Sequence, residues 1–334
     1  MTMRADELSP YGLHRVIDQP GALPQAAERL DAALPCQATE LEIAVDYIHL
    51  DASSLRQLRN EHGDDASAIR DALFALVRRR GKLHNPVTNS GGMLTGVVRT
   101  AGAFYPSPPP PGTRIASLVS LTLTPLHLDF LGQPDLHASA IMARGRAFLF
   151  ETGIWVELPP DIPERVALAA FDVAGAPARV RVRTRPGARV LIIGAGHSGA
   201  LCAIAAAEAG AAEVLVADID PIRLSRLERL KLPTIRPILG NAQDGVAFAG
   251  LVGAPADLTV SCVNVPGIET ACILATRKTG HILFFSMTTD FTRAALGAEG
   301  LGSGATLEIG NGYLPGHAAQ VVDLLHRYPM LWDD

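Results

Sequence analysis

Apolar and polar residues alternate in short runs along the first half of the chain. Every second residue between 40 and 47 is apolar, which predicts a strand of an antiparallel sheet with one buried face. The buried face would carry Leu41, Ile43, Val45 and Tyr47, and the solvent face Glu40, Glu42 and Asp46. Further short strands are expected over 93–99, 114–122 and 146–156. This half is therefore predicted to be mostly β.

Two helices are expected after the first strand. Asp51, Ser53 and Ser54 occupy N-cap positions ahead of LRQLR, and a second helix is predicted over Asp65 to Arg79. The segment before the first strand, 1–33, is an amphipathic leader interrupted by prolines, and its early charged residues do not fit a signal peptide.

The pattern changes after Pro159. An apolar strand over 190–193 leads through a glycine-rich turn into an alanine-rich helix, and a second apolar strand follows over 214–217. Continuous apolar strands that alternate with helices are typical of a parallel sheet covered on both faces. The sequence therefore predicts an α/β protein, with a β-rich domain over 1–160 and a doubly wound parallel sheet over 161–334.

The turn in the second half contains a dinucleotide-binding fingerprint. Gly194, Gly196 and Gly199 form GxGxxG between the first strand and its helix, where glycines allow a tight turn, close approach of a pyrophosphate and close helix packing. Asp218 ends the second strand, about twenty residues further on, where a carboxylate binds the ribose hydroxyls and repels a 2′-phosphate. We therefore expect NAD as the cofactor in preference to NADP.

Four other residues are candidates for cofactor contacts. His197 and Ser198 lie inside the fingerprint, and the alternative for His197 is a solvent-facing position in the first helical turn. Asn264 follows a predicted strand at the carboxyl edge of the sheet, where a nicotinamide ring would rest, and its alternative is a plain turn. Arg223 lies just beyond Asp218, and a flexible arginine at this position could still accommodate the 2′-phosphate of NADP.

The composition of the chain limits the classes of partner that it can bind. A chain of 334 residues with a net charge of −5 has no basic field for nucleic acid, and its longest apolar tract is broken by charges and glycines, which makes it a poor membrane span. The four cysteines are far apart, with no CxxC pair and no zinc-ligand spacing. We expect reduced thiols, a cytoplasmic location, a small-molecule partner and a homodimer.

The order of the domains resembles the medium-chain dehydrogenase/reductase superfamily, in which a GroES-like domain precedes a Rossmann domain. The stretches NSGGMLTGVVRTAG and PPGTRIASLV resemble segments of its first domain. The chain has Gly91, Gly92 and Met93 where zinc members carry Gly-His-Glu, and Asp51 near the position of the catalytic cysteine. The structural zinc loop is also absent, and the chain end is too short for the usual return into the first domain. The resemblance therefore implies that the site binds no metal. It also implies that Gly91 and Gly92 leave room for the substrate.

Within this superfamily, KLHNPVTNSGGMLTG, GAGHSGA, VADID and IGNGYLPGHA together resemble the family of L-erythro-3,5-diaminohexanoate dehydrogenases of lysine fermentation. The resemblance spans about Glu40 to the C-terminus. It implies NAD-dependent oxidative deamination of L-erythro-3,5-diaminohexanoate to (S)-5-amino-3-oxohexanoate, with release of ammonia.

This reaction requires a base, because the reacting carbon loses a hydride only when its amine is neutral. Asp51 and His84 are the candidates. The alternative role of Asp51 is the N-cap of the following helix, and that of His84 is an ordinary loop histidine.

A substrate with two ammonium groups and a carboxylate also needs fixed polar partners. Asn85, Thr88, Asn89 and Ser90 precede a predicted strand and are expected to form a substrate-binding rim in the cleft between the domains, although an ordinary polar turn has the same composition. Two other functions stay open at this point. One is a zinc-independent medium-chain ketone, enal or quinone reductase, and the other is a non-enzymatic nucleotide-sensing protein.

Overall fold

The computed structural model describes residues 8–310 and 312–331, and the chain divides into two compact units, Met1–Asp172 and Val173–Asp334. The sequence predicts a boundary between residues 160 and 161, before helix α3 (Glu164–Val173). The structure instead divides after Asp172, so nearly all of α3 belongs to the first unit.

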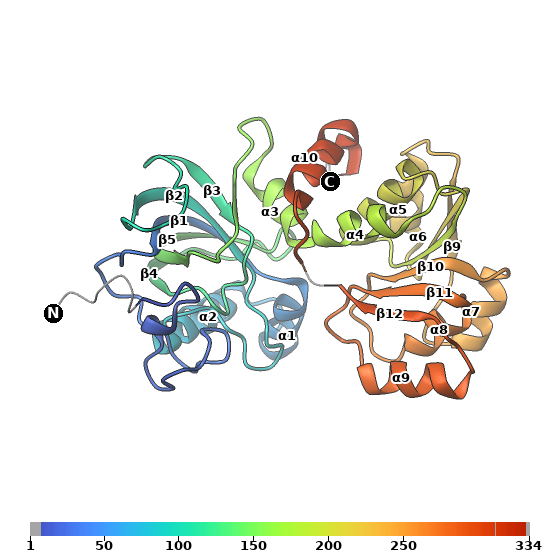
Figure 1. Cartoon of the computed structure of the whole chain (residues 1–334), viewed down its shortest axis with the longest axis horizontal. Helices are drawn as coiled ribbons and strands as arrows, with labels where there is room; N and C mark the ends of the chain where they lie inside the picture. Colours follow the sequence, from blue (N-terminus) through green and yellow to red (C-terminus); the bar gives the residue numbers. More distant parts are fainter. Residues whose placement is uncertain (1–7, 311, 332–334) are drawn as a thin grey trace. The chain divides into compact units, whose positions relative to one another are not determined.

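The first unit is built on a six-stranded antiparallel sheet (Figure 1). The strand order is β4-β5-β1-β2-β3-β6, and β1 lies in the interior between β5 and β2. The strands are β1 Glu40–His49, β2 Met93–Ala101, β3 Arg114–Ser117, β4 Leu126–Leu131, β5 Ala140–Phe150 and β6 Trp155–Glu157. The helices are the 3-10 turn η2 Leu13–Arg15, α1 Ala52–His62, α2 Ala66–Arg80 and α3. Helix α2 packs against β4 and α1.

Strand β1 departs from the simple alternation that the sequence shows. Leu41, Ile43 and Val45 are buried as expected, but the pairing with β2 and β5 shifts in register between Val45 and Tyr47. A bulge reverses the faces that follow it, so Ile48 is buried in place of the expected Tyr47. The bulge lies three residues before the end of the strand that leads into α1.

Two of the predicted strands differ from the observed ones, and one observed strand has no counterpart in the prediction. The strand expected over 114–122 ends at Ser117, and the one expected over 146–156 is two strands, β5 and β6, which are separated by a turn at Glu151 to Gly153. Strand β4 was not predicted, although its buried Leu126 and Leu128 alternate with exposed His127. The proline before it hides the short period-two signal among turn residues.

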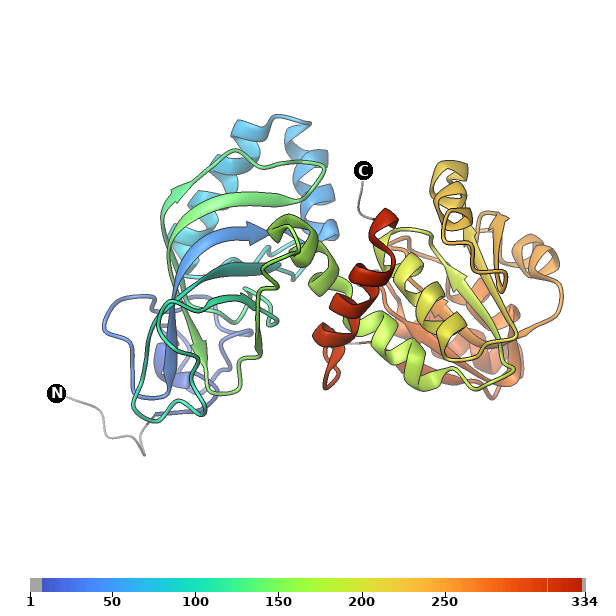
Figure 2. The same ribbon diagram turned by 90° about the horizontal axis from the view of Figure 1, so that it is seen from above.

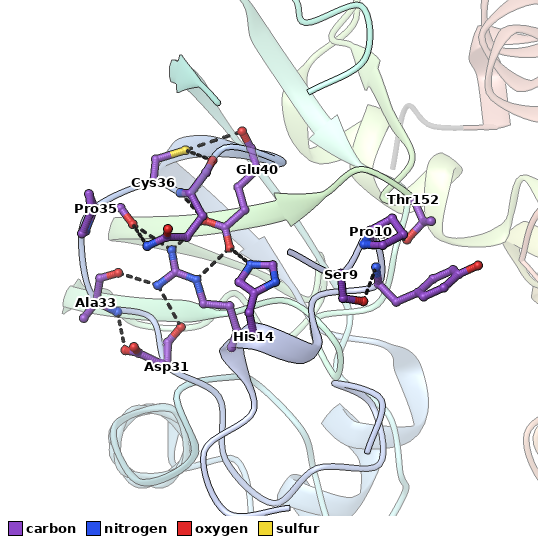
Figure 3. A network of polar contacts seen from close by, with 12 residues as sticks. Ser9, Pro10, His14, Asp31, Ala33, Pro35, Cys36, Glu40 and Thr152 are labelled. Carbon is purple, nitrogen blue, oxygen red and sulfur yellow. Dashed lines mark hydrogen bonds and ion pairs between the residues drawn. The ribbon is translucent and has the colours of Figure 1, made fainter. Parts of the chain in front are cut away.

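The described part of the leader, residues 8–33, is attached to the sheet through buried charges (Figure 3). The Arg15 guanidinium donates to both carboxylate oxygens of Glu40, Nε to Oε1 at 2.7 Å and Nη2 to Oε2 at 2.6 Å. His14 Nε2 lies 2.8 Å from Oε1, and the Gln37 backbone N–H donates to Oε2 at 2.8 Å. The placement of Glu40 on a solvent face is therefore wrong: its side chain is fully buried because the leader covers this end of β1.

The second unit contains a six-stranded parallel sheet in the order β12-β11-β10-β7-β8-β9. Its strands are β7 Arg189–Ile193, β8 Glu213–Asp218, β9 Ile235–Leu239, β10 Ala256–Ser261, β11 Thr276–Phe284 and β12 Thr306–Ile309. Its helices are α4 Gly175–Arg183, α5 His197–Glu208, α6 Pro221–Glu228, α7 Gly245–Val252, α8 Glu269–Leu274, α9 Phe291–Gly300, α10 His317–Arg327 and the 3-10 turn η3 Pro329–Leu331.

Helices cover both faces of this sheet (Figures 1 and 2). Helix α5 packs on β7 and β8 and against α4, while α8 packs on β10 and β11 between α7 and α9. The chain order of the strands reverses between β7 and β10, which is the switch point of a doubly wound sheet and the place where such sheets bind ligands. The prediction of a Rossmann domain is confirmed. No helix within the described residues has both the length and the apolar character to cross a membrane.

Candidate active site

The glycine turn after β7 has the geometry that a dinucleotide requires. Gly194 adopts φ +107°, and a Cβ there would lie 2.6 Å from Val263 Cγ1. A Cβ on Gly199 would collide with the Gly194 carbonyl oxygen, so this glycine permits close packing of α5 on the turn. A Cβ on Gly196 would meet open space, and no side chain caps α5 at this residue. Open space at an uncapped helix N-terminus fits a pyrophosphate.

Asp218 lies directly beside this turn. Its Oδ2 accepts a hydrogen bond from the Ala195 backbone N–H at 2.7 Å, and its Oδ1 accepts one from the Asp220 backbone N–H at 2.9 Å. Each oxygen keeps a further acceptor position, so the carboxylate can still bind ribose hydroxyls. Asp218 therefore connects the end of β8 to the glycine turn of β7, a supporting role that the sequence did not indicate.

The other candidate cofactor residues lie around the same edge. His197 is exposed as the first residue of α5, whereas the Ser198 hydroxyl contacts the Cys262 sulfur at 3.4 Å. Arg223 lies 3.5 Å from the Asp220 carboxylate. Asn264 Oδ1 accepts hydrogen bonds from the Ser286 hydroxyl and the Met287 backbone N–H, which joins the loops after β10 and β11. Asn264 thus lies at the carboxyl edge, where it was expected.

The polar loop before β2 is a closed turn. The Asn85 backbone N–H donates to the Ser90 carbonyl at 2.9 Å, and the Asn85 side chain bonds both Val87 N and Gln57 Oε1. Asn89 is exposed and adopts φ +53°, a left-handed conformation that asparagine tolerates better than most residues. Of the expected rim, Asn85 therefore turns inward to hold the loop, while Asn89 faces solvent.

Four hydroxyl groups connect this loop to the start of α1. The Ser90 hydroxyl lies 2.7 Å from Thr88 Oγ1, 2.9 Å from Ser54 Oγ and 3.3 Å from Ser53 Oγ. Ser54 and Thr88 are also 2.9 Å apart. The structure therefore brings the loop and the residues after Asp51 together, with Ser90 and Ser54 buried and Thr88 half-buried.

The two glycines at the end of the loop do not leave space. A Cβ on Gly91 would lie 2.9 Å from the Thr122 nitrogen and would also strike the Leu83 carbonyl oxygen, and one on Gly92 would strike the His49 carbonyl oxygen. The expectation that these glycines make room for substrate is wrong. They permit close approach of backbone segments, and this holds the loop against β1.

Asp51 serves as the N-cap of α1 with only one of its oxygens. Oδ1 accepts from the backbone N–H groups of Ser53 at 3.0 Å and Ser54 at 2.9 Å, and from the Ser53 hydroxyl. Oδ2 is buried and has no hydrogen-bond partner among residues 8–310 and 312–331. The capping role and a chemical role are therefore compatible, because capping leaves this second oxygen unpaired.

His84, the other expected base, is half-buried at the start of the loop. Burial lowers its pKa, and the positive charges of Lys82 and Arg80 act in the same direction, while the Asn89 side chain opposes them. The imidazole is therefore neutral near pH 7 and able to accept a proton.

One acidic residue near Asp51 was missed. Asp172 lies in α3, and burial, followed by the negative charge of Asp51, raises its pKa to about 7. A carboxyl group with a pKa near neutrality is a candidate acid or base. The sequence offered no signal for it, because α3 is more than a hundred residues away from Asp51. Within the described residues, no group of three or more His, Cys, Asp or Glu side chains could hold a metal ion.

Comparisons with known proteins cover both units. A family model described as the L-erythro-3,5-diaminohexanoate dehydrogenase N-terminal domain matches residues 14–159, and one described as the alanine dehydrogenase/PNT C-terminal domain matches residues 176–281. A curated L-erythro-3,5-diaminohexanoate dehydrogenase of Acetoanaerobium sticklandii is 39% identical over 95% of each chain. One of Fusobacterium nucleatum is 38% identical over 96% of each chain.

Solved structures agree on the fold. The chain is similar to 2R,3R-butanediol dehydrogenase from Bacillus subtilis, with a TM-score of 0.52, 15% identity, and coverage of 90% of this chain and 84% of that one. It is also similar to CurK enoyl reductase, with a TM-score of 0.54, 16% identity, and coverage of 90% and 82%. These likenesses confirm the predicted combination of a GroES-like and a Rossmann domain.

Proposed function

The chain belongs to the L-erythro-3,5-diaminohexanoate dehydrogenase family, and from that premise we propose that it oxidatively deaminates L-erythro-3,5-diaminohexanoate with NAD. The products are (S)-5-amino-3-oxohexanoate, ammonia and NADH. The chain is an oxidoreductase, and its glycine turn fits a nicotinamide dinucleotide. The observation that supports the amine chemistry is the free carboxylate oxygen of Asp51 beside the polar loop.

The reaction has three steps at one carbon. The substrate ammonium first loses a proton, then the carbon loses a hydride to give an iminium ion, and water finally adds to that carbon and ammonia leaves. When bound, NAD accepts the hydride. The chain must therefore supply a base, a means of holding the substrate charges, and donors or acceptors that orient the water.

We assign the base to Asp51, with Asp172 as its neighbouring carboxyl group. Asp51 attracts the substrate ammonium and accepts its proton through Oδ2, while Oδ1 stays fixed to the start of α1. Asp172, with its pKa near 7, changes its protonation at physiological pH and can relay the proton away. His84 remains the second candidate for the same step, since its neutral imidazole is an acceptor.

We assign substrate binding to the outer part of the loop. Thr88 and Asn89 are its more accessible polar residues and would contact the substrate carboxylate or second ammonium group. Ser90 and Asn85 would fix them in place through the bonds within the loop. Fixed partners matter because each polar group left unpaired in a site closed to water costs about 1–3 kcal/mol.

The proposed reaction is tested by its products. We expect the purified chain to reduce NAD with L-erythro-3,5-diaminohexanoate and to release one ammonia for each NADH, and to leave L-lysine and simple secondary alcohols unchanged. Dialysis against a chelator should not change the rate. Reduction of an enal or quinone with no turnover of the diamine would instead support a reductase, and cofactor binding without any turnover would support a nucleotide sensor.

Cofactor preference gives a second test. We propose that the protein binds NADH more tightly than NADPH because Asp218 repels a 2′-phosphate, and that Asp218→Ser narrows this difference about tenfold, or 1.4 kcal/mol. Fluorescence titration with both cofactors measures the two dissociation constants. Asp218→Ser should also weaken the binding of NADH, because it removes the hydrogen bond from the Ala195 backbone N–H. Asp244→Asn is the control, since Asp244 caps α7. A wild type that prefers NADPH tenfold would show that Arg223 outweighs Asp218.

We further propose that the enzyme acts in lysine degradation, in the cytoplasm and as a homodimer. Its four cysteines are free, as a reducing compartment would keep them. Twofold dimers are the commonest assembly of soluble enzymes. Light scattering on the purified chain gives the mass that checks the dimer.

A further inference from the structure

Two thiols lie together behind the glycine turn of the second unit. Cys202 is buried in α5, and Cys262 is half-buried directly after β10. Their sulfur atoms are 4.0 Å apart, and the Ser198 hydroxyl lies 3.4 Å from the Cys262 sulfur. The Cys262 backbone N–H donates to the Ile193 carbonyl, so Cys262 lies next to the residue that begins the turn.

We propose that Cys262 is an oxidation site for peroxides, that its oxidised sulfur forms a disulfide with Cys202, and that this disulfide weakens binding of the nicotinamide dinucleotide. The proposal concerns regulation of the cofactor site, and it does not depend on which amine the enzyme oxidises.

The surroundings of Cys262 favour its thiolate form over those of the three other cysteines. Hydrogen bonds with the Cys202 thiol and the Ser198 hydroxyl lower its pKa against the effect of burial. Burial raises the pKa of the three other thiols, that of Cys36 to about 12, and also those of Cys202 and Cys272. Since the thiolate is the species that attacks peroxide, oxidation should begin at Cys262.

The chemistry then needs no further reagent. The Cys262 sulfur attacks one oxygen of the peroxide, the O–O bond breaks, and a sulfenic acid and water form when hydrogen peroxide is the oxidant. The Cys202 sulfur attacks the sulfenic sulfur, the S–O bond breaks, and a second water leaves. Two thiols have lost two hydrogens, and one hydrogen peroxide has been reduced to two waters.

The disulfide would strain the dinucleotide turn. The two sulfur atoms, now 4.0 Å apart, must come within bonding distance, and this would draw the second turn of α5 toward the end of β10. The glycine turn lies between these elements and has little free space, because a Cβ on Gly194 would meet Val263 and one on Gly199 would meet the Gly194 carbonyl oxygen. A shift of α5 moves the backbone N–H groups that would bind the pyrophosphate, which lowers cofactor affinity.

The test uses the full chain and a small excess of hydrogen peroxide. We expect intact mass spectrometry to show loss of two hydrogens and peptide mapping to find a Cys202–Cys262 link. NADH fluorescence titration should show affinity at least tenfold weaker, and dithiothreitol should restore it. In Cys202→Ala, dimedone should label Cys262 and no link should form.

Cys36→Ser and Cys272→Ser are the matched controls, and both should form the link and lose affinity as the wild type does. The proposal is overturned if the wild type forms no Cys202–Cys262 link, if dimedone labels another cysteine of Cys202→Ala in preference to Cys262, or if the link forms while NADH affinity stays unchanged.

Discussion

Arg15→Met should lower the free energy of unfolding by about 3–5 kcal/mol, because it leaves the Glu40 carboxylate buried without its ionic partner. The guanidinium makes two bonds to Glu40, donates to the carbonyls of Ala33 and Pro35, and lies 4.3 Å above the Phe148 ring. Urea titration of the full chain measures the loss.

A matched variant tests whether the loss of stability is specific to Arg15 or follows from removing any arginine of the leader. Arg29→Met removes an exposed ion pair with Asp18, at 3.6 Å, and should change stability by less than about 1 kcal/mol. The double variant Arg15→Met with Glu40→Met should be much less destabilised than the sum of the two single variants, because no charge then stays buried. An equal decrease in the free energy of unfolding in Arg15→Met and Arg29→Met would contradict the role of the buried pair.

The same pair predicts acid sensitivity. Burial alone would raise the pKa of Glu40, but the hydrogen bonds from Arg15 and His14 outweigh it and lower the pKa from 4.5 to about 2. Because the folded-state pKa is lowered, this contribution is complete above pH 4.5 and is lost as pH falls from about 4.5 toward 2. Arg15→Met should therefore show a weaker pH dependence in that range.

The fold was largely predictable because its signals are local. The glycine fingerprint, the continuous apolar strands and the N-cap residue Asp51 each act within one element or one turn, and the structure has them where expected. The errors arose where a distant segment decides the outcome. Glu40 is buried by a leader that reaches it from 25 residues away, and the bulge after Val45 depends on pairing with β2 and β5.

The candidate site divides in the same way. Asp51 and the loop residues could be named from the sequence, because polar residues stood out beside apolar strands. Their contacts could not, since the bond between Ser54 and Ser90 joins residues 36 apart and Asp172 reaches Asp51 only through the fold. The sequence suggests that Gly91 and Gly92 leave room for a substrate. Whether a glycine borders open space or backbone depends on the segment opposite it, which here contains Leu83 and His49.

Asp51→Asn should lower kcat for the diamine about 100-fold or more, with little loss of stability. Asparagine caps helices about as well as aspartate, so the bonds to Ser53 and Ser54 and the start of α1 are preserved. What disappears is the charge and basicity of Oδ2, and a general base contributes about 10²–10⁴ in rate. Asp65→Asn is the control, because Asp65 caps α2 in the same way from an exposed position.

The pH dependence distinguishes a base from a residue that only supports the loop. In the wild type, kcat/KM should rise through about pH 7 as Asp172, whose pKa is raised to about 7, loses its proton and becomes able to take up the proton from Asp51. Asp172→Asn removes the group with this pKa, so the rise near pH 7 should disappear. Thr88→Ala should mainly raise KM and leave the profile in place. Unchanged turnover in Asp51→Asn, or an equal loss of turnover in Asp65→Asn, would show that Asp51 acts as a helix cap alone. His84→Ala would then be expected to lower kcat instead.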